Sequence, residues 1–327
     1  MAKTHAIVIH ELGGPEVLRY QEIDLAPPAA GEVQIRHAAI GLNFIDVYFR
    51  TGLYKAPNGL PFIPGKEAAG TVIAVGPGVT DFAIGDRVAY AGADGAYSVE
   101  RNVETRHLVK VPDGIDLETA AAMMLKGMTA EYLLNRTYKV GPETVLLFHA
   151  AAGGVGLIAG QWAKALGATV IGTAGSAEKV ELALAHGYDH VINYREEDFV
   201  ERVRALTGGK GVDVVYDSVG RDTFPKSIDG LKPRGMWVSF GQSSGPIEPF
   251  NLALLAQKGS LYATRPTLFA YIATPEELSA CAKSLFDVVQ SNKVRINVHQ
   301  TYPLADAARS HVDLESRRTS GTTLLLP

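Results

Sequence analysis

Cysteine is almost absent from this sequence, and its scarcity excludes several classes of protein. Cys281 is the only cysteine among 327 residues, so neither an intrachain disulfide framework nor a cysteine-rich zinc site is possible. The first residues, Met-Ala-Lys-Thr-His, lack the apolar core of a secretory signal. We therefore expect a reduced, cytoplasmic protein.

An excess of basic charge is missing as well. Lys and Arg number 31 against 35 Asp and Glu, which gives a formal net charge of −4. This balance makes nucleic acid an unexpected partner and gives no reason for adhesion to an acidic membrane. The short basic segments at 232–234 and 317–318 are interpreted as solvated loops. Hydrophobic residues make up 46% of the chain, enough for about two domains of ~150 residues each.

Sustained apolar runs are also missing, although one stretch is ambiguous. Residues 144–163 carry no formal charge and are long enough to span a bilayer. They contain four glycines, His149 and Gln161, whereas a spanning helix needs sustained hydrophobicity. We interpret the stretch as a buried strand, a glycine turn and a helix, and we expect no membrane association.

The first part of the chain, up to about residue 123, has the pattern of a β-rich domain. Glycine and proline clusters separate short apolar or alternating runs. Such dense punctuation is typical of a compact barrel-like sheet. The predicted strands are 6–9, 32–39, 70–75 and 87–90.

From about residue 143 the pattern changes to alternating strands and helices. Alternation of this kind predicts a doubly wound parallel sheet, so the fold class is α/β. The strands are predicted at 145–148, 169–171, 190–192, 212–216, 236–240 and 260–263, with helices at 155–166, 177–186 and 198–206.

A long helix is predicted after residue 265. Thr274, Pro275 and Glu277 form the pattern of an N-cap, a first-turn proline and a capping box. The apolar stripe of this helix includes Cys281, which we therefore expect in the core rather than as a reactive thiol. Residues 322–326 are predicted to form a final strand.

The glycine turn after the strand at 145–148 predicts a dinucleotide site. Gly153 would let the backbone approach a pyrophosphate, and Gly156 would let the following helix pack closely on the strand. The helix N-terminus would then present free N–H groups to the phosphates. A bare glycine motif is weak, but here a strand precedes it and an amphipathic helix follows.

The end of the second strand of this unit indicates which dinucleotide binds. NAD-binding proteins usually carry an acidic residue there, whereas residues 172–177 contain none. Glu178, the first acid, falls inside the next helix. Ser176, Lys179 and Arg195 offer a hydroxyl and cations to a 2′-phosphate. The sequence therefore predicts NADPH rather than NADH.

Two other motifs have weaker interpretations. His186 and His190 are four residues apart, but Gly187 breaks the helix that would align them on a metal, so no metal site is predicted. Residues 241–245 match the G-x-S-x-G pattern of a hydrolase nucleophile. Pro246 follows at once, where that pattern requires a helix, so a strand-end loop is the better interpretation.

Many short segments, in order along the whole chain, resemble one family. They include Gly41-Leu-Asn-Phe-Ile-Asp-Val-Tyr48, Gly65-Lys-Glu-Ala-Ala-Gly70, Leu125-Lys-Gly-Met-Thr129, Phe148-His-Ala-Ala-Ala-Gly-Gly-Val-Gly156 and Asp217-Ser-Val-Gly220. With these the chain resembles the zeta-crystallin-like NADPH:quinone oxidoreductases of the medium-chain dehydrogenase/reductase superfamily, and in particular their bacterial members. The resemblance implies a GroES-like β-barrel catalytic domain at 1–124, completed by 266–327, and a Rossmann NADPH-binding domain at 125–265.

The resemblance also points to the zinc-free branch of the superfamily. The zinc enzymes hold their metal with a histidine in a Gly-His-Glu motif and with two cysteines, but here that motif is Gly65-Lys66-Glu67 and the cysteines are missing. Alcohol oxidation through a zinc alkoxide is then unavailable, whereas a quinone accepts a hydride without a Lewis acid.

The resemblance further implies the residues of the site. Asn43, Asp46, Tyr48 and Tyr54 would frame the acceptor pocket, with a tyrosine as a possible donor to the quinone oxygen. Both tyrosines are open to a packing interpretation as well. Lys179 and Tyr194 would hold the 2′-phosphate. The full set expected to contact the dinucleotide is Asn43, Thr129, Gly153, Gly154, Val155, Gly156, Ser176, Lys179, Tyr194, Ser218, Phe240, Ser243 and Arg317.

The predicted function is zinc-independent reduction of quinones by NADPH in the cleft between the two domains. An alkenal or enone double-bond reductase on the same scaffold is a second interpretation, and an NADPH-sensitive RNA-binding or crystallin-like structural protein is a third. We also expect a homodimer that pairs through the strand at 260–263, because exposed sheet edges tend to be covered.

Overall fold

The computed structural model describes residues 2–327, and these fall into two compact units. Unit 1 comprises the residues up to Met128 together with Ile272–Gln290 and Ile296–Pro327. Unit 2 comprises Thr129–Tyr271 and Ser291–Arg295. Each unit has its own hydrophobic core, as the apolar composition requires.

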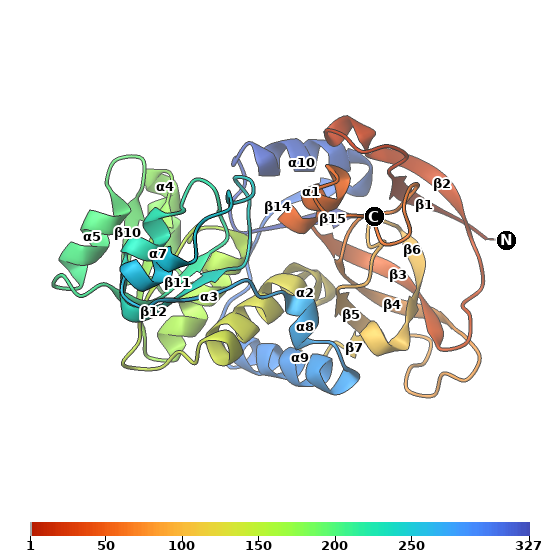
Figure 1. Ribbon diagram of the computed structural model, residues 1–327. Coiled ribbons are helices and arrows are strands. Elements are labelled where there is room, and N and C mark those ends of the chain that lie inside the picture. The colour runs from red at the N-terminus through yellow and green to blue at the C-terminus, as the bar shows by residue number, and fades with distance from the viewer. Residues whose placement is uncertain (1) are drawn as a thin grey trace. The chain divides into compact units, whose positions relative to one another are not determined.

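Unit 2 is built on a parallel sheet of six strands in the order β10-β9-β8-β11-β12-β13. Numbered from its own first strand, this is the 3-2-1-4-5-6 order of a Rossmann fold, with the switch point at β8. Figure 1 shows helices α3, α4, α5 and α7 around this sheet. The strands are β8 (Val145–Phe148), β9 (Thr169–Ala174), β10 (His190–Asn193), β11 (Val212–Asp217), β12 (Leu231–Ser239) and β13 (Tyr262–Thr264). The helices are α3 (Gly154–Ala165), α4 (Ala177–Leu184), α5 (Phe199–Leu206), α6 (Lys226–Asp229), α7 (Ala253–Gln257) and α8 (Leu268–Tyr271).

Unit 1 contains a seven-stranded sheet and a two-stranded hairpin. Along the larger sheet the order is β14-β15-β3-β4-β5-β7, and β6 pairs with β3. The strands are β1 (Ala2–Val8), β2 (Arg19–Leu25), β3 (Glu32–Gly41), β4 (Glu67–Val75), β5 (Arg87–Ala91), β6 (Glu100–Glu104), β7 (Val109–Lys110), β14 (Val298–Pro303) and β15 (Thr322–Leu326). The helices are α1 (Phe44–Arg50), α9 (Pro275–Gln290) and α10 (Ala307–Glu315), and α2 (Leu117–Tyr132) begins in unit 1 and ends in unit 2.

The α/β fold class is confirmed, and so are the predicted strands, although several of them are longer than predicted. β4 begins at Glu67 because residues 67–69 continue the ladder with β5 beyond Gly70. β12 begins at Leu231, whose backbone pairs with Val212 before the register shifts. The predicted strand at 260–263 is shorter, since Ser260 has a positive φ of 57° and only Tyr262–Thr264 form the ladder.

Three further segments that the sequence left open to interpretation are resolved by the structure. Residues 144–163 form β8, the glycine turn and most of α3, and no helix within residues 2–327 is long and apolar enough to cross a bilayer. The loop after β12 runs without a helix until α7, so the G-x-S-x-G segment lacks the elbow geometry of a hydrolase. Cys281 is 1% exposed in α9, in the core as predicted.

Candidate active site

The glycine turn between β8 and α3 has the shape of a pyrophosphate cradle. Gly153 is the N-cap of α3 and has no side chain that could accept a hydrogen bond from the first N–H groups of the helix. A Cβ on Gly156 would lie 2.5 Å from the carbonyl oxygens of Ala150 and Ala151, so only glycine fits there. The N–H groups of residues 154–156 have no partner within the described chain and stand at the positive end of the helix dipole. An anionic diphosphate fits this turn.

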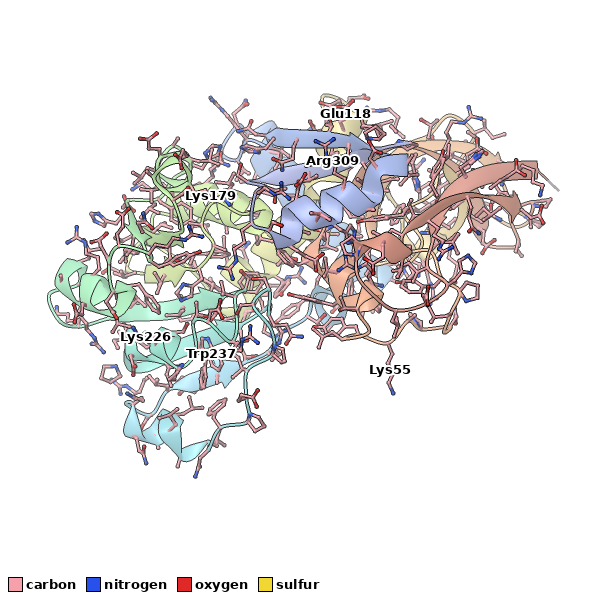
Figure 2. All side chains as sticks on the ribbon, turned by 90° about the horizontal axis from the view of Figure 1, so that it is seen from above. Lys55, Glu118, Lys179, Lys226, Trp237 and Arg309 are labelled. Atoms are coloured by element: carbon pink, nitrogen blue, oxygen red, sulfur yellow. The ribbon has the colours of Figure 1, made fainter. Side chains whose placement is uncertain are left out.

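The next strand end gathers the residues predicted for the 2′-phosphate. Ser176 is the N-cap of α4, and its hydroxyl accepts from the N–H of Lys179. A Cβ on Gly175 would lie 2.5 Å from the Tyr194 hydroxyl, so the tyrosine side chain lies against the turn that follows β9. Figure 2 labels Lys179 in the first turn of α4. Ser176, Lys179 and Tyr194 therefore lie on or against the short segment that joins β9 to α4. Glu178 lies in the helix, as predicted.

The loops after β11 and β12 are joined to each other by backbone hydrogen bonds. The Ser243 N–H donates to the Ser218 carbonyl at 3.1 Å, and the Phe240 N–H donates to the Asp217 carbonyl at 2.8 Å. The Phe240 ring lies 5.6 Å from that of Phe148 at the end of β8. Three predicted residues, Ser218, Phe240 and Ser243, therefore lie together at the carboxyl edge of the sheet, where doubly wound folds bind ligands.

A buried polar cluster beneath that edge was not predicted from the sequence. The Asp217 carboxylate accepts from the hydroxyls of Thr223 and Ser227, each at 2.8 Å, and from the N–H groups of Val219 and Gly220. Since Ser227 donates to Asp217, it accepts from His149 Nε2 at 3.1 Å. Burial lowers the pKa of His149, so the ring is neutral at neutral pH. The cluster fixes the loop that carries Ser218.

In unit 1, the predicted acceptor residues lie on or beside α1. Asn43 is the N-cap of α1, and its backbone N–H donates to Asp46 Oδ2 at 2.9 Å, which completes a capping box. The rings of Tyr48 and Tyr54 are 5.3 Å apart, edge to face. Tyr48 is 8% exposed and also lies 6.5 Å from the Phe44 ring. The structure therefore brings these four residues together around one short helix.

Asp46 ends a buried chain of donors that sequence reasoning missed. Arg50 donates to His311 Nδ1 at 3.0 Å, which leaves the proton of His311 on Nε2. Nε2 lies 3.1 Å from the Tyr97 hydroxyl, and this hydroxyl donates to Asp46 Oδ2 at 3.0 Å. Burial raises the pKa of Asp46 to about 7 and lowers that of His311 to about 3. Asp46 Oδ1 is buried and has no partner among the described residues.

The two remaining predicted nucleotide residues lie away from these groups in sequence. Thr129 is 7% exposed and sits in α2, at the point where unit 2 begins. Arg317 follows α10 with a positive φ of 58° and is exposed.

At the zinc-binding motif of the superfamily, the structure shows an ion pair instead. The Lys66 ammonium is 2.5 Å from Asp94 and donates to the Gly92 carbonyl at 3.3 Å. A protonated amine has no lone pair for a metal. No group of three or more His, Cys, Asp or Glu within residues 2–327 is arranged to hold a metal ion.

A second buried ion pair lies beside Asn43 and was not predicted. Lys126, in α2, is 2.6 Å from Glu67 at the start of β4, and both side chains are almost fully buried. Asn43 Nδ2 donates to the same Glu67 oxygen at 2.8 Å. The segments 65–70 and 125–129 were noted only as parts of a resemblance, and nothing in their spacing showed that these charges would meet.

Comparison with known proteins identifies the family. The family model described as an alcohol dehydrogenase GroES-like domain matches residues 29–142, and that of a zinc-binding dehydrogenase matches residues 154–277. A quinone oxidoreductase of Pseudomonas aeruginosa is 55% identical over 96% of this chain and 97% of its own. The chain belongs to the quinone oxidoreductase family of the medium-chain dehydrogenase/reductase superfamily. The predicted resemblance is thereby confirmed.

Other members of the family extend the comparison. The structure of the Escherichia coli quinone oxidoreductase complexed with NADPH is similar over all of both chains, with a TM-score of 0.96 and 53% identity. A 2-haloacrylate reductase of a Burkholderia species is 47% identical over 98% of both chains. The GroES-like and Rossmann-like architecture of this chain matches that of the solved quinone oxidoreductase structures.

Proposed function

We propose that this chain reduces quinones with NADPH. The observation that carries the proposal is the end of β9, where Ser176, Lys179 and Tyr194 gather and no acid follows the strand, in a chain 55% identical to a named quinone oxidoreductase. When bound, NADPH supplies a hydride from C4 of its nicotinamide. The protein supplies binding, orientation and electrostatics.

Each predicted site residue receives a role under this proposal. The N–H groups of the Gly153–Gly156 turn hold the pyrophosphate, with Thr129 and Arg317 as further contacts. Lys179, Tyr194 and Ser176 bind the 2′-phosphate. Ser218, Phe240 and Ser243 receive the nicotinamide end, on two loops joined by backbone hydrogen bonds; the Asp217 carboxylate fixes the first of these loops. Asn43, Asp46, Tyr48 and Tyr54 frame the acceptor, where an O–H can stabilise the oxygen that gains charge. Unit 1 would thus be the catalytic domain and unit 2 the NADPH-binding domain.

The reaction is proposed to need no zinc. The place of the metal-binding histidine is taken by Lys66, whose ammonium is held by Asp94. A quinone accepts electrons readily, so no Lewis acid is required to polarise it.

A relative favours a second candidate function. The Burkholderia protein is named a 2-haloacrylate reductase, and its likeness to this chain is 47%. Haloacrylates and enones have an activated double bond that accepts hydride from the same cofactor. Only the acceptor pocket would need to differ between the two activities.

The deciding experiment measures NADPH oxidation by the purified, chelator-treated protein. 1,4-Benzoquinone and an α,β-unsaturated ketone are supplied side by side, and each assay is repeated with NADH. Fast turnover of the quinone that prefers NADPH and survives chelation is expected. Turnover of the enone alone would transfer the protein to the double-bond reductases, and turnover that stops on chelation would contradict the zinc-free mechanism.

We further propose a cytoplasmic homodimer. The single cysteine is free and buried, which suits a reducing compartment. β13 pairs on one side with β12 and with no other strand among residues 2–327. Its Tyr262 is 60% exposed, and a second copy could cover this edge.

A further inference from the structure

In the ion pair of Glu67 and Lys126, the carboxylate has more hydrogen-bond partners than the ammonium. Glu67 Oε1 accepts from the backbone N–H of Leu125 at 2.7 Å, and Oε2 accepts from Asn43 Nδ2 at 2.8 Å and from Lys126 at 2.6 Å. Its carboxylate also lies against Gly41, where a Cβ would come within 2.0 Å of Oε2. The acid is therefore fixed in place by three donors and by its packing.

Lys126, in contrast, makes one hydrogen bond. Its ammonium has three donor hydrogens, and within residues 2–327 only Glu67 accepts from it. The residue is only 5% exposed, which leaves little surface for bulk water to satisfy the other two. Buried donors are nearly always paired, with protein, ordered water or ligand. The two remaining N–H groups thus call for an acceptor that the described chain does not provide.

The same cluster holds an acceptor without a donor. Asp46 Oδ1 is the one buried side-chain oxygen or nitrogen in the described residues that lacks a partner. Asn43 links the two acids, because its backbone N–H binds Asp46 and its side chain binds Glu67. Lys126 also lowers the pKa of Asp46 through its charge, so the two groups are near one another. Unused donors and an unused acceptor around Asn43 describe a place for a small polar group.

We propose that the Lys126 ammonium, fixed by Glu67, binds the acceptor oxygen that becomes negatively charged during reduction. The inference rests on the proposed function and adds a catalytic residue to it. Because the ammonium is already oriented by Glu67, it need not reorganise as charge develops, and it interacts more strongly with an oxyanion than with a neutral carbonyl oxygen. Burial enhances this difference.

The chemistry balances as follows. The hydride brings two electrons and one hydrogen to the quinone, and the nicotinamide is oxidised. The product of this step is the hydroquinone monoanion, whose negative charge resides on oxygen. A proton from water then gives the hydroquinone. Lys126 acts on the charged oxygen in the first step and loses no proton.

The test compares Glu67→Gln with the double variant Glu67→Gln/Lys126→Met. Lys126→Met alone would leave Glu67 as a buried carboxylate without its cation. In Glu67→Gln the amide oxygen still accepts a hydrogen bond from Lys126, and a melting curve of each variant verifies that it folds. The double variant differs from its reference only by the ammonium. For quinones we expect kcat/KM to fall about 10²-fold when the ammonium is removed, the size seen for loss of one oxyanion donor. NADPH affinity, followed by nicotinamide fluorescence, is expected to stay within about twofold.

Acceptor chemistry provides the discriminating readout. Methylene blue is a cation that becomes neutral on accepting a hydride, so no oxyanion forms. Loss of the ammonium should leave its reduction rate within about twofold. Equal losses with methylene blue and benzoquinone would overturn the proposal and indicate a structural role for Lys126.

A binding experiment tests the same point without turnover. 4-Nitrophenol absorbs visible light only as the phenolate. Protein that retains Lys126 should bind the phenolate and lower the pKa of the bound phenol, and the double variant should not. If the pKa of bound 4-nitrophenol were the same in both proteins, the proposal would be overturned. It would also be overturned if the protein that retains Lys126 bound no phenolate.

Lys66→Met is the matched control. It removes a neighbouring buried ammonium, but one held by Asp94 and Gly92. We expect the ratio of quinone to methylene blue rates to be unchanged. If the unmodified protein reduced no quinone with NADPH, the proposed function itself would be wrong. If it reduced quinones normally and the loss of Lys126 left kcat/KM unchanged, only this inference would be rejected.

Discussion

At the scale of single residues, we predict that the preference for NADPH over NADH depends on Lys179. Its backbone N–H donates to the Ser176 hydroxyl, which fixes Lys179 in the first turn of α4, and the Tyr194 hydroxyl lies at the turn just before this helix. A charge-assisted hydrogen bond to a 2′-phosphate contributes about 1.5–3 kcal/mol. Lys179→Ala should therefore raise the KM for NADPH by about 10- to 100-fold and change that for NADH by less than about twofold, as measured by steady-state kinetics.

The control for this variant is Lys226→Ala. Lys226, labelled in Figure 2, is a surface lysine of the same unit, paired with Asp198 at 2.6 Å. Both KM values should stay unchanged in it. Equal losses of NADPH and NADH affinity in Lys179→Ala would contradict the 2′-phosphate assignment.

Asp46 gives a second prediction at this scale, for stability against pH. Its pKa is raised to about 7 in the folded chain, above the ordinary value of 3.8. Between these values the folded state binds more protons than the unfolded state, so this group's contribution falls by about 1.4 kcal/mol per pH unit as pH rises. Above pH 7 the loss is complete. Asp46→Asn should therefore raise Tm at pH 8 and have little effect at pH 4.

Comparison within a variant pair isolates that effect. The neutral buried His37 and His311, with pKa values lowered to about 3, act in the opposite direction, because stability from them is lost as pH falls below about 6.5. Asp86→Asn is the control: Lys110 lowers the pKa of Asp86, so this variant should gain no Tm at pH 8. A larger gain for Asp46→Asn at pH 4 than at pH 8 would refute the raised pKa.

The residues of this network also show where sequence reasoning stops. Asp46, Tyr97 and His311 meet although they are far apart along the chain. Their contact depends on tertiary packing of α1, a loop and α10, and no periodicity encodes it. Glu67 and Lys126 escaped prediction for the same reason. The places of Gly153, Gly156 and Lys179 at the starts of α3 and α4 could be predicted, because they follow from local backbone geometry around one strand and helix.

At the scale of elements, prediction succeeded where one face is apolar and the ends carry local signals. α9 begins at Pro275 with Thr274 as its cap, as its sequence predicts. α2 was missed because residues 120–124 and Met128 are all fully buried, so no polar stripe reveals the helical period. The start of β1 was missed because its Lys3 and His5 face solvent in a polar hairpin with β2.

The cap of α9 yields a stability prediction. The Glu277 N–H donates to Thr274 Oγ1 at 3.2 Å, and Glu277 Oε2 accepts from the Thr274 N–H at 3.2 Å. Thr274→Ala should cost about 1 kcal/mol of unfolding free energy, measured with urea, whereas Thr274→Ser should cost far less. If Ala and Ser were equally destabilising, the lost methyl group rather than the cap would be the cause.

At the scale of the whole molecule, the proposed homodimer depends on the open edge of the unit 2 sheet. β13 is three residues long, and Ala263 pairs with Trp237 of β12 on one side. In a two-fold dimer the same edge meets itself, so a charge placed there faces its own copy. Ala263→Asp should therefore convert the dimer into a monomer at micromolar concentration, as read by light scattering after size exclusion, while Ala263→Ser stays dimeric.

NADPH affinity should survive in the monomer, because the cradle at Gly153–Gly156 and the end of β9 belong to one chain. A wild-type protein that elutes as a monomer, or an Asp variant that remains a dimer, would place the interface elsewhere.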